Sequence, residues 1–482
     1  MQKTFLTNLG FLLLVNLLIK PFYILGIDAE VQNVVGAEDY GNYFAILNFT
    51  FLFNILNDLG ITNFNNRNIA QHKEKLEAHF PRIIVLRFFL LLVYGVVTFF
   101  SGLFVGYSKW QLTLLAFLAL NQGLIASIYF LRSNLSGLHL FKQDSIISVL
   151  DRALLILFCG ILLWTDVAQS EFKIEWFVYA QTISYLITFL TAFVLVRRKI
   201  SRLRLRIDPS FWKSIINQSA PFAILILLLS IYHRIDTVIL ERIVVDGDVQ
   251  SGIYAQGFRF LDALNNFSFL FAVLLFPMFS RMLENGEDCK ELLDLATRIL
   301  ISTVGIMAIT CFFFRVDIID WRYTTNIDMA ATCFGLLILT AICHSTVHVF
   351  GTLLTSGGKL RTLNIISAFA VLLSLGLNLW LAPKLLALGS TIANLTTNVL
   401  VSGAHILIVH RIFGYSISGS VLLRLILLFL VMIPVGNFAH FFPGSWFISA
   451  CIMGAIGVAL ALAMKLIDIA GLMGILKRNE TR

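Results

Sequence analysis

The chain has 482 residues, of which 58% are hydrophobic and 13% are charged, and its formal net charge is +8. Because soluble globular proteins carry about 25% charged residues, this composition excludes an ordinary soluble protein. Apolar runs near the roughly 20 residues that a helix needs to cross a membrane recur along the whole sequence. Alternation with a period of two is absent over long stretches, which argues against a membrane β-barrel. We therefore predict an all-α polytopic membrane protein.

About fourteen transmembrane helices are predicted in chain order. They span residues 5–26, 41–62, 84–105, 110–131, 146–165, 174–196, 216–240, 252–278, 296–314, 330–354, 364–383, 386–409, 422–440 and 445–464. Lys3 precedes the first apolar run and no small-residue cleavage site follows it, so we expect a retained helix rather than a removed signal peptide. The division between the eleventh and twelfth spans depends on Pro383 and Lys384, which interrupt one long apolar run.

The distribution of Lys and Arg predicts the orientation of the chain. With the N-terminus in the cytoplasm, most of the 36 Lys and Arg residues fall on the inner side, which is the arrangement that membrane insertion favours. The acidic stretches 26–41 and 244–250 then lie outside, and an even number of spans places both termini in the cytoplasm. The basic stretch 197–213 is expected to lie on anionic lipid headgroups, so the positive charge does not indicate nucleic-acid binding. The predicted location is the cell (plasma) membrane.

Two pairs of similar motifs indicate an internal repeat. Residues 37–49 and 249–260 each follow an acidic stretch and open a span with Gly-x-Tyr. Residues 135–148 and 355–367 each lead from Ser-Gly through a cationic stretch to Ile-Ile-Ser. Because six spans are an even number, the two copies would run in the same direction, as in transporters built from parallel repeats.

The repeat predicts the domain organisation. We expect two lobes of six helices each, followed by two additional C-terminal helices. The boundaries are residues 1–207 for the first lobe with its basic loop, 208–411 for the second lobe, and 412–482 for the last two helices and the tail. Such a chain can form a cavity without a second subunit, so we predict a monomer.

Several longer stretches resemble one transporter family. They are VVGAEDYGNYF (34–44), NDLGITNFNNRNIA (57–70), RIDTVILERIVVDGDVQSGIYAQGFRF (234–260), LFPMFSRM (275–282) and LNLWLAPKLLALGSTIANL (377–395). Together they resemble the polysaccharide-export flippases of the multidrug/oligosaccharidyl-lipid/polysaccharide exporter superfamily, over roughly residues 1–411. The last stretch departs from the usual pattern, because Leu385 and Leu386 follow Pro383-Lys384 and only Gly389 remains. The resemblance implies a flippase for lipid-linked oligosaccharide, with two lobes around a central cavity.

Cations inside the predicted spans are the candidate substrate-binding residues. Lys20 lies seven residues before Ile27, Arg234 seven before Glu241 and Arg259 seven after Gly252, so each is about 10 Å along a helix from the outer end. A charge in hydrocarbon costs at least a few kcal/mol, so each should face protein or water. The helical neighbours of Arg234 are not acidic, so its partner must come from another helix or from a ligand. We predict that the three cations line the cavity and bind the diphosphate of the cargo.

Structural roles stay open for the same charges. Arg259 and Asp262 are three residues apart on one helix and can form an ion pair. Asp236 can pair with its neighbour His233 or, across two helices, with Arg259. Lys20 can extend to the outer headgroups.

Other polar residues have alternative interpretations. Asp58 lies near the cytoplasmic end of the second span, where it can carry a coupling proton or cation or satisfy a helix end. His344 and His348 share one face of the tenth span; no third metal ligand is evident, so a proton-relay or cavity role stays open. The six cysteines form no Cys-x-x-Cys pair, and neither a disulfide framework, a metal site nor a cofactor is expected.

The predicted function is therefore transport rather than catalysis. The cargo is a polyprenyl-pyrophosphate-linked oligosaccharide, such as an O-antigen unit, flipped from the cytoplasmic to the outer leaflet, with a proton or sodium ion as the coupling ion. A cation-coupled multidrug exporter of the same superfamily is the alternative, although it would want a carboxylate in the first span, where Lys20 lies. A membrane glycan polymerase or ligase would usually carry its polar residues on a large outer loop, and no predicted outer loop is large.

Overall fold

The structure is a computed structural model that describes residues 19, 21–62, 65, 69, 76–138, 140–165, 172–200, 205–439 and 444–467. Within these ranges every regular element is a helix, which confirms the predicted all-α class. Packing divides the chain into two compact units, Met1–Gly252 and Ile253–Arg482, and each is described by itself. The predicted two-lobe repeat and its domain boundaries stay predictions.

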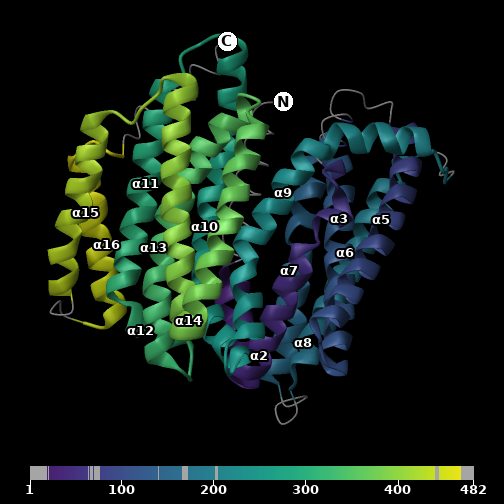
Figure 1. The fold of residues 1–482 in the computed structure, drawn as a ribbon, viewed down its shortest axis with the longest axis horizontal. Helices are drawn as coiled ribbons and strands as arrows, with labels where there is room; N and C mark the ends of the chain where they lie inside the picture. Colours follow the sequence, from purple (N-terminus) through teal and green to yellow (C-terminus); the bar gives the residue numbers. More distant parts are fainter. Residues whose placement is uncertain are drawn as a thin grey trace. The chain divides into compact units, whose positions relative to one another are not determined.

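The first unit contains eight helices and the start of a ninth among its described residues (Figure 1). These are η1 (Tyr23–Asp28, a π-helix), α2 (Ala29–Leu52), α3 (Ile55–Asp58), α5 (Leu76–Val105), α6 (Lys109–Gly137), α7 (Phe141–Trp164), α8 (Ile174–Arg197), α9 (Pro209–Ile243) and the first residues of α10 (Gly247–Glu284). The N-terminal part of α9 crosses the end of α5, where the indole of Trp212 donates a hydrogen bond to the carbonyl of Arg82 (3.0 Å). Phe80 and Phe130 stack at 5.6 Å in the apolar core between α5 and α6.

The second unit contains the rest of α10 and the remaining helices. These are α11 (Lys290–Phe313), α12 (Arg315–Arg322), α13 (Ile327–Ser356), α14 (Leu360–Phe413), α15 (Gly419–Ala439) and α16 (Trp446–Ala463). The last two helices pack on α11 through an apolar cluster that includes Leu428, Met432 and Met453.

The described helices coincide with the predicted spans over most of the chain. Eleven of them are long and apolar enough to cross a membrane. One of these, α14, holds both the eleventh and the twelfth predicted spans and is broken at Leu386, where φ is 57° and ψ is −138°. The break lies three residues after Pro383, so the predicted division of this apolar run is confirmed. Most of the first predicted span lies outside the described residues, and its last residues overlap η1. The second predicted span overlaps α2 and α3.

The predicted outer loop at residues 26–41 is the main local difference. The structure shows a helix there, which turns at Gly36 (φ 85°, ψ 169°), a conformation that favours glycine. Asp28 and Glu30 suggested an exposed loop, yet Asp28 is fully buried. Local acidity was therefore a poor guide, because this carboxylate finds its partners inside the unit.

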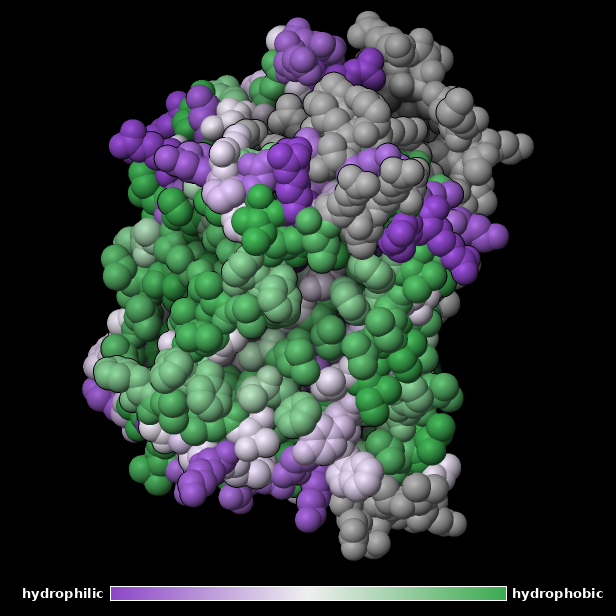
Figure 2. Space-filling view, turned by 90° about the vertical axis from the view of Figure 1, so that its right-hand side faces the viewer, coloured by the Kyte–Doolittle hydropathy of each residue, from purple (hydrophilic) through white to green (hydrophobic). Residues whose placement is uncertain are grey.

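The surface carries an apolar band that suits a lipid environment. Figure 2 shows hydrophobic side chains across the middle of one face, between two hydrophilic zones. On α5, the exposed fractions of Phe88, Phe100 and Phe104 are 59%, 62% and 94%. Such a large exposed apolar surface is unfavourable in water and favourable against hydrocarbon, so the multi-pass membrane prediction is confirmed.

Candidate functional site

The two Gly-x-Tyr motifs meet at one end of the first unit. A Cβ added to Gly41 would lie 2.7 Å from the backbone nitrogen of Gly252, so only glycine permits this approach of α2 to the start of α10. The hydroxyl of Ser251 donates to the carbonyl of Gly41 (3.2 Å), and the amide of Gln32 donates to the carbonyl of Gly252 (2.9 Å). Our topology assigns this end to the outer side, and we call it the outer end.

A polar network joins three helices at the outer end. The amide of Gln111 on α6 donates to Asn42 on α2 (2.9 Å) and to the carboxylate of Glu241 on α9 (3.0 Å). Arg242 donates to the amide oxygen of Gln111 (3.2 Å), and its guanidinium lies 4.0 Å from the centre of the Tyr107 ring. The network holds the ends of α2, α6 and α9 together.

Arg234 lies on α9, eight residues from Arg242 and therefore about 12 Å farther into the unit. Its Nη1 donates to the amide oxygen of Asn48 on α2 (3.4 Å), and its guanidinium lies 5.0 Å from the centre of the Phe51 ring. The amide of Asn48 itself donates to the carbonyl of Phe44 (2.8 Å), which orients its oxygen. Arg234 remains partly exposed. A partner on another helix, or a ligand, was predicted, and the structure supplies Asn48 and Phe51 on α2.

The other predicted charges lie in different places. Asp236 is buried on α9, with an exposed fraction of 1%. Arg259 and Asp262 lie partly buried on α10 in the second unit. Lys20 lies outside the residues that the structure describes. The common depth of the three cations and their role in binding stay predictions.

The two histidines of α13 belong to the second unit. Nε2 of His348 forms a hydrogen bond with the amide oxygen of Asn265 on α10 (2.9 Å), and its ring lies 6.0 Å from that of Phe269. His344, one turn away, is buried. Among the described residues, no three His, Cys, Asp or Glu side chains gather closely enough to hold a metal. A proton-relay or cavity role for the pair stays a prediction.

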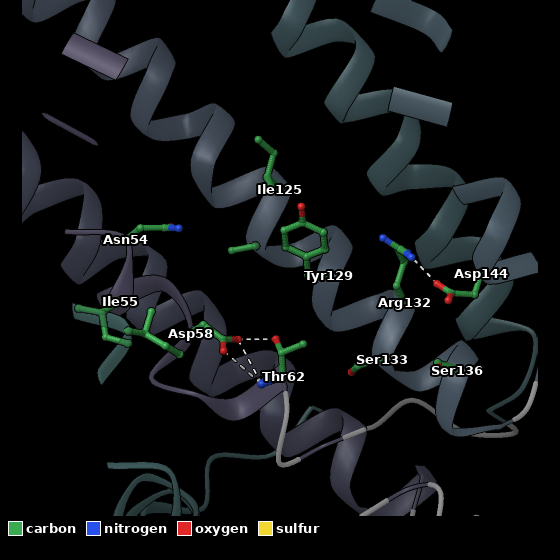
Figure 3. Close-up of a pocket in the computed structure, with 12 residues that line it drawn as sticks. Asn54, Ile55, Asp58, Thr62, Ile125, Tyr129, Arg132, Ser133, Ser136 and Asp144 are labelled. Carbon is green, nitrogen blue, oxygen red and sulfur yellow. Dashed lines mark hydrogen bonds and ion pairs between the residues drawn. The ribbon is translucent and has the colours of Figure 1, made fainter. Parts of the chain in front are cut away.

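A cavity of about 440 Å³ opens in the first unit. Figure 3 shows Asn54, Asp58 and Thr62 on one side of it, and Ile125 and Tyr129 of α6 on the other. Arg132, Ser133 and Ser136 of α6, Asp144 of α7 and Ile226 of α9 complete much of the lining. Our topology assigns this end of the unit to the cytoplasm.

Arg87 of α5 holds two walls of this cavity together. It is buried, forms an ion pair with Asp58, and donates to the hydroxyl of Thr62 (3.1 Å) and to the carbonyl of Ala126 on α6 (2.7 Å). The carboxylate of Asp58 also accepts the backbone N–H of Thr62 (3.2 Å). These contacts support the helix-end interpretation of Asp58, and its role in ion coupling stays a prediction.

A second ion pair lies on the opposite wall. Nε of Arg132 is 2.7 Å from the carboxylate of Asp144, and the guanidinium lies 6.0 Å from the centre of the Tyr129 ring. The three charged residues that line the cavity, Asp58, Arg132 and Asp144, are therefore all in ion pairs. Paired charges make this lining polar but close to neutral.

A buried cluster near the first span was missed by the sequence analysis. Asp28, in the π-helix η1, accepts a hydrogen bond from the hydroxyl of Tyr40 (2.8 Å). Arg152 of α7 lies 4.7 Å from the centre of the Tyr23 ring and donates to the hydroxyl of Tyr185 (3.1 Å). π-Helical turns often occur at functional sites. Arg152 and Arg87 both lie inside predicted spans, so the signal that selected Arg234 could have found them.

Comparison with known proteins identifies one family model and several similar folds. The model, described as a polysaccharide biosynthesis protein, matches residues 5–283. The lipid II flippase MurJ, in an inward closed conformation, has a TM-score of 0.74 at 13% identity, over 98% of this chain and 99% of that chain. No curated protein sequence matches.

Two transporters from another branch share the fold. An inward-facing multidrug resistance MATE family transporter of the MOP superfamily has a TM-score of 0.62 at 14% identity, over 81% of this chain and 95% of that chain. The eukaryotic MATE transporter AtDTX14 has a TM-score of 0.61 at 14% identity, over 94% of this chain and 99% of that chain. At these identities the likeness concerns the fold.

Proposed function

Because the chain belongs to the polysaccharide biosynthesis protein family, we propose that it flips polyprenyl-pyrophosphate-linked oligosaccharide from the cytoplasmic to the outer leaflet. Its fold is that of the MOP superfamily, the multidrug/oligosaccharidyl-lipid/polysaccharide exporters that the sequence predicted. The chain is therefore a membrane transporter, and the alternative of a glycan polymerase or ligase is set aside.

Arg234 is the observation that supports this cargo. Its guanidinium contacts an amide oxygen and an aromatic ring, which are neutral groups that hold the side chain in place. Part of the side chain stays exposed, so it can receive a ligand. A guanidinium donates two parallel hydrogen bonds to phosphate oxygens, which a diphosphate supplies.

The proposed path separates the two parts of the cargo. The lipid tail remains in hydrocarbon, where each buried methylene is favourable, and the charged headgroup passes through a cationic cavity by alternating access. Lys20 and Arg259 are proposed as further cations of this cavity, and a proton or sodium ion as the coupling ion. The basic stretch before α9 would contact anionic lipids, and a monomer would suffice.

The test measures flipping of lipid-linked oligosaccharide in reconstituted vesicles. Arg234→Ala should abolish flipping at a normal protein level, and Arg234→Lys should restore only part, because a lysine keeps the charge but loses the two-pronged geometry. Arg206→Ala is the matched control, since Arg206 is an exposed cation just before α9, and it should flip as the wild type does.

A purely structural role of Arg234 predicts a different result when Arg234 and Asp236 are replaced together. If Arg234 only balances the buried charge of Asp236, the joint change to Ala and Asn should recover flipping, because neither charge is then stranded. Recovery in the double variant would remove Arg234 from the binding site.

A second candidate function is a cation-coupled drug exporter. The sequence argued against it because no carboxylate was evident in the first span, but the structure places Asp28 in η1, buried beside Tyr40. Efflux of ethidium from the same vesicles, driven by a proton or sodium gradient and lost in Asp28→Asn, would favour this candidate. Gradient-independent leakage of ethidium would count against it.

A further inference from the structure

Among the residues that the structure describes, the second unit holds three histidines that are buried or partly buried within helices. His344 and His348 lie on α13, and His405 lies on α14 after the break at Leu386. Ionisable side chains are rare inside membrane spans because a charge there is costly, and in transporters they often relay protons. Histidine suits that task, since its ring takes up and releases a proton near neutral pH.

The helices α13 and α14 lie side by side, and their contact brings His405 to the turn that carries His348 (Figure 1). A Cβ added to Gly351 would lie 3.5 Å from Cδ2 and 3.5 Å from Nε2 of the His405 ring. Gly351 is three residues from His348, and such residues share one face of a helix, with about 5–6 Å between their Cβ atoms. Our topology assigns the nearby ends of both helices to the cytoplasm.

Hydrogen bonds fix which nitrogen of each ring carries a proton. Nε2 of His348 lies 2.9 Å from the amide oxygen of Asn265 on α10, and Nδ1 of His405 lies 2.8 Å from the carbonyl oxygen of Val401. Because such an oxygen only accepts, each of these two nitrogens is the donor. In the neutral rings, Nδ1 of His348 and Nε2 of His405 therefore keep the lone pair that can accept a proton.

Charged groups on the helices around His348 would respond to a proton there. On α10, Asp262 lies three residues before the hydrogen-bond partner of His348, and Arg259 lies one turn farther along. On α11, which packs against α13, Arg298 is eight residues from the end assigned to the cytoplasm, as His348 is on α13, so both are about 12 Å from that end. On α14 the neighbouring group is His405. Protonation of His348 would therefore change the electrostatic forces between α13 and the helices around it.

We propose that His348 and His405 carry the coupling proton through the second unit as cargo moves to the outer leaflet. A proton from the outer side binds Nδ1 of His348, His348 gives that proton up to Nε2 of His405, and His405 releases it to the cytoplasm. Only N–H bonds form and break, and both rings return to their neutral form. The proposal rests on the proposed function and selects the proton, rather than sodium, as the coupling ion.

The experiment measures how a proton gradient distributes lipid-linked sugar across vesicles that contain the full-length chain. The probes are undecaprenyl pyrophosphate bearing N-acetylglucosamine or galactose, a lectin reads the sugar exposed outside, and potassium with valinomycin holds the membrane potential at zero. If one proton is exchanged per cargo, a gradient of one pH unit should enrich an accepted probe about tenfold in the leaflet on the acidic side, because that gradient supplies about 1.4 kcal/mol per proton.

Two conservative variants separate a proton path from a packing role. In His348→Gln and His405→Gln, the glutamine amide can still donate to the oxygen of Asn265 or Val401, but it does not take up a proton. Each variant should therefore lose the enrichment that the proton gradient drives. His410→Gln is the matched control, because His410 is an exposed histidine of the same helix as His405, and it should enrich the probe as the wild type does.

Each contrary result has one meaning. Flipping in the wild type that ignores the proton gradient, or that only a sodium gradient drives, would overturn the proton path and leave the proposed function in place. Full enrichment in both His348→Gln and His405→Gln would assign these histidines to packing.

A measurement on the wild type keeps the test decisive if a variant does not fold. A pH-sensitive dye inside the vesicles should report proton movement while the probe is flipped. Flipping without proton movement would overturn the path, and no flipping of either probe would overturn the proposed function and the path together.

Discussion

The two ends of the α2–α9 pair in the first unit are built in opposite ways. At the outer end, Gly41 lets backbones touch, and Gln111 links α2, α6 and α9 through hydrogen bonds. Toward the other end, Ile226 of α9 and Asn54, which lies two residues beyond the end of α2, line a cavity of about 440 Å³. The same two helices therefore close one end of the unit and leave the other end open.

The difference lies in what holds each end. The outer end depends on the buried hydrogen bonds of Gln32 and Ser251 and on the network around Gln111, and a typical hydrogen bond contributes only about 0.5–1.5 kcal/mol. The open end depends on Arg87, a buried cation that joins three segments of chain. The outer end is therefore held by close backbone contact and hydrogen bonds, and the cavity wall by an ion pair.

The largest loss of thermal stability is expected from Arg87→Ala, which removes the ion pair with Asp58 in the cavity wall. Removal of Arg87 leaves Asp58, whose side chain is 25% exposed, without its cation and leaves the carbonyl of Ala126 without its donor, so the loss should exceed that of an exposed pair, about 0–1 kcal/mol. The thermal unfolding temperature of the purified protein should fall sharply. Arg82→Ala is the control, because its pair with Asp208 is partly exposed and such pairs contribute about 0–1 kcal/mol. Equal losses in both variants would refute the special role of Arg87.

A smaller loss of thermal stability is expected from Gly41→Ala, which would push α2 and the start of α10 apart at the outer end. The added methyl group meets the backbone of Asp248 and Gly252, which cannot rotate away, and overpacking of this kind costs about 1–3 kcal/mol. Gly95→Ala in α5 is the matched control, because a Cβ there meets nothing within 4 Å. The control should be neutral or slightly stabilising, since alanine favours helix. Unfolding temperatures that match between the variants would show that the close approach contributes nothing.

The smallest expected effect is a change in how stability depends on pH, through Asp39 at the outer end. Partial burial, and then the carboxylates of Glu175 and Asp248, raise the pKa of Asp39 above its usual value. A raised pKa means that the folded state binds the proton more tightly, so this contribution is present at low pH and is lost as pH rises through the folded-state pKa. Asp39→Asn should therefore be less sensitive than the wild type to a rise from pH 4 to pH 7. The measurement is the unfolding temperature across that range, with exposed Glu38→Gln as the control; a wild-type pH response in Asp39→Asn would contradict the assignment.

The sequence predicted what depends on neighbours along the chain. Apolar run lengths located eleven helices that can cross a membrane, and the interruption at Pro383 marked the division of α14, whose break lies at Leu386. The motifs around Gly41 and Gly252 indicated the family, and the position of Arg234 in an apolar run indicated that it needs a partner on another element. These signals are local, so they survive without knowledge of the fold.

What only the tertiary structure decided is which distant residues meet. Asp28 reads as part of an acidic outer loop, but its helix is packed so that Tyr40 can donate to it. Arg87 lies in a predicted span, and its partner Asp58 comes from another helix. The free energy of a buried charge depends on the groups around it in space, and no local pattern records which groups those are. The membrane and the helices therefore follow from the sequence alone, whereas the cavity and its paired charges exist only once the helices pack.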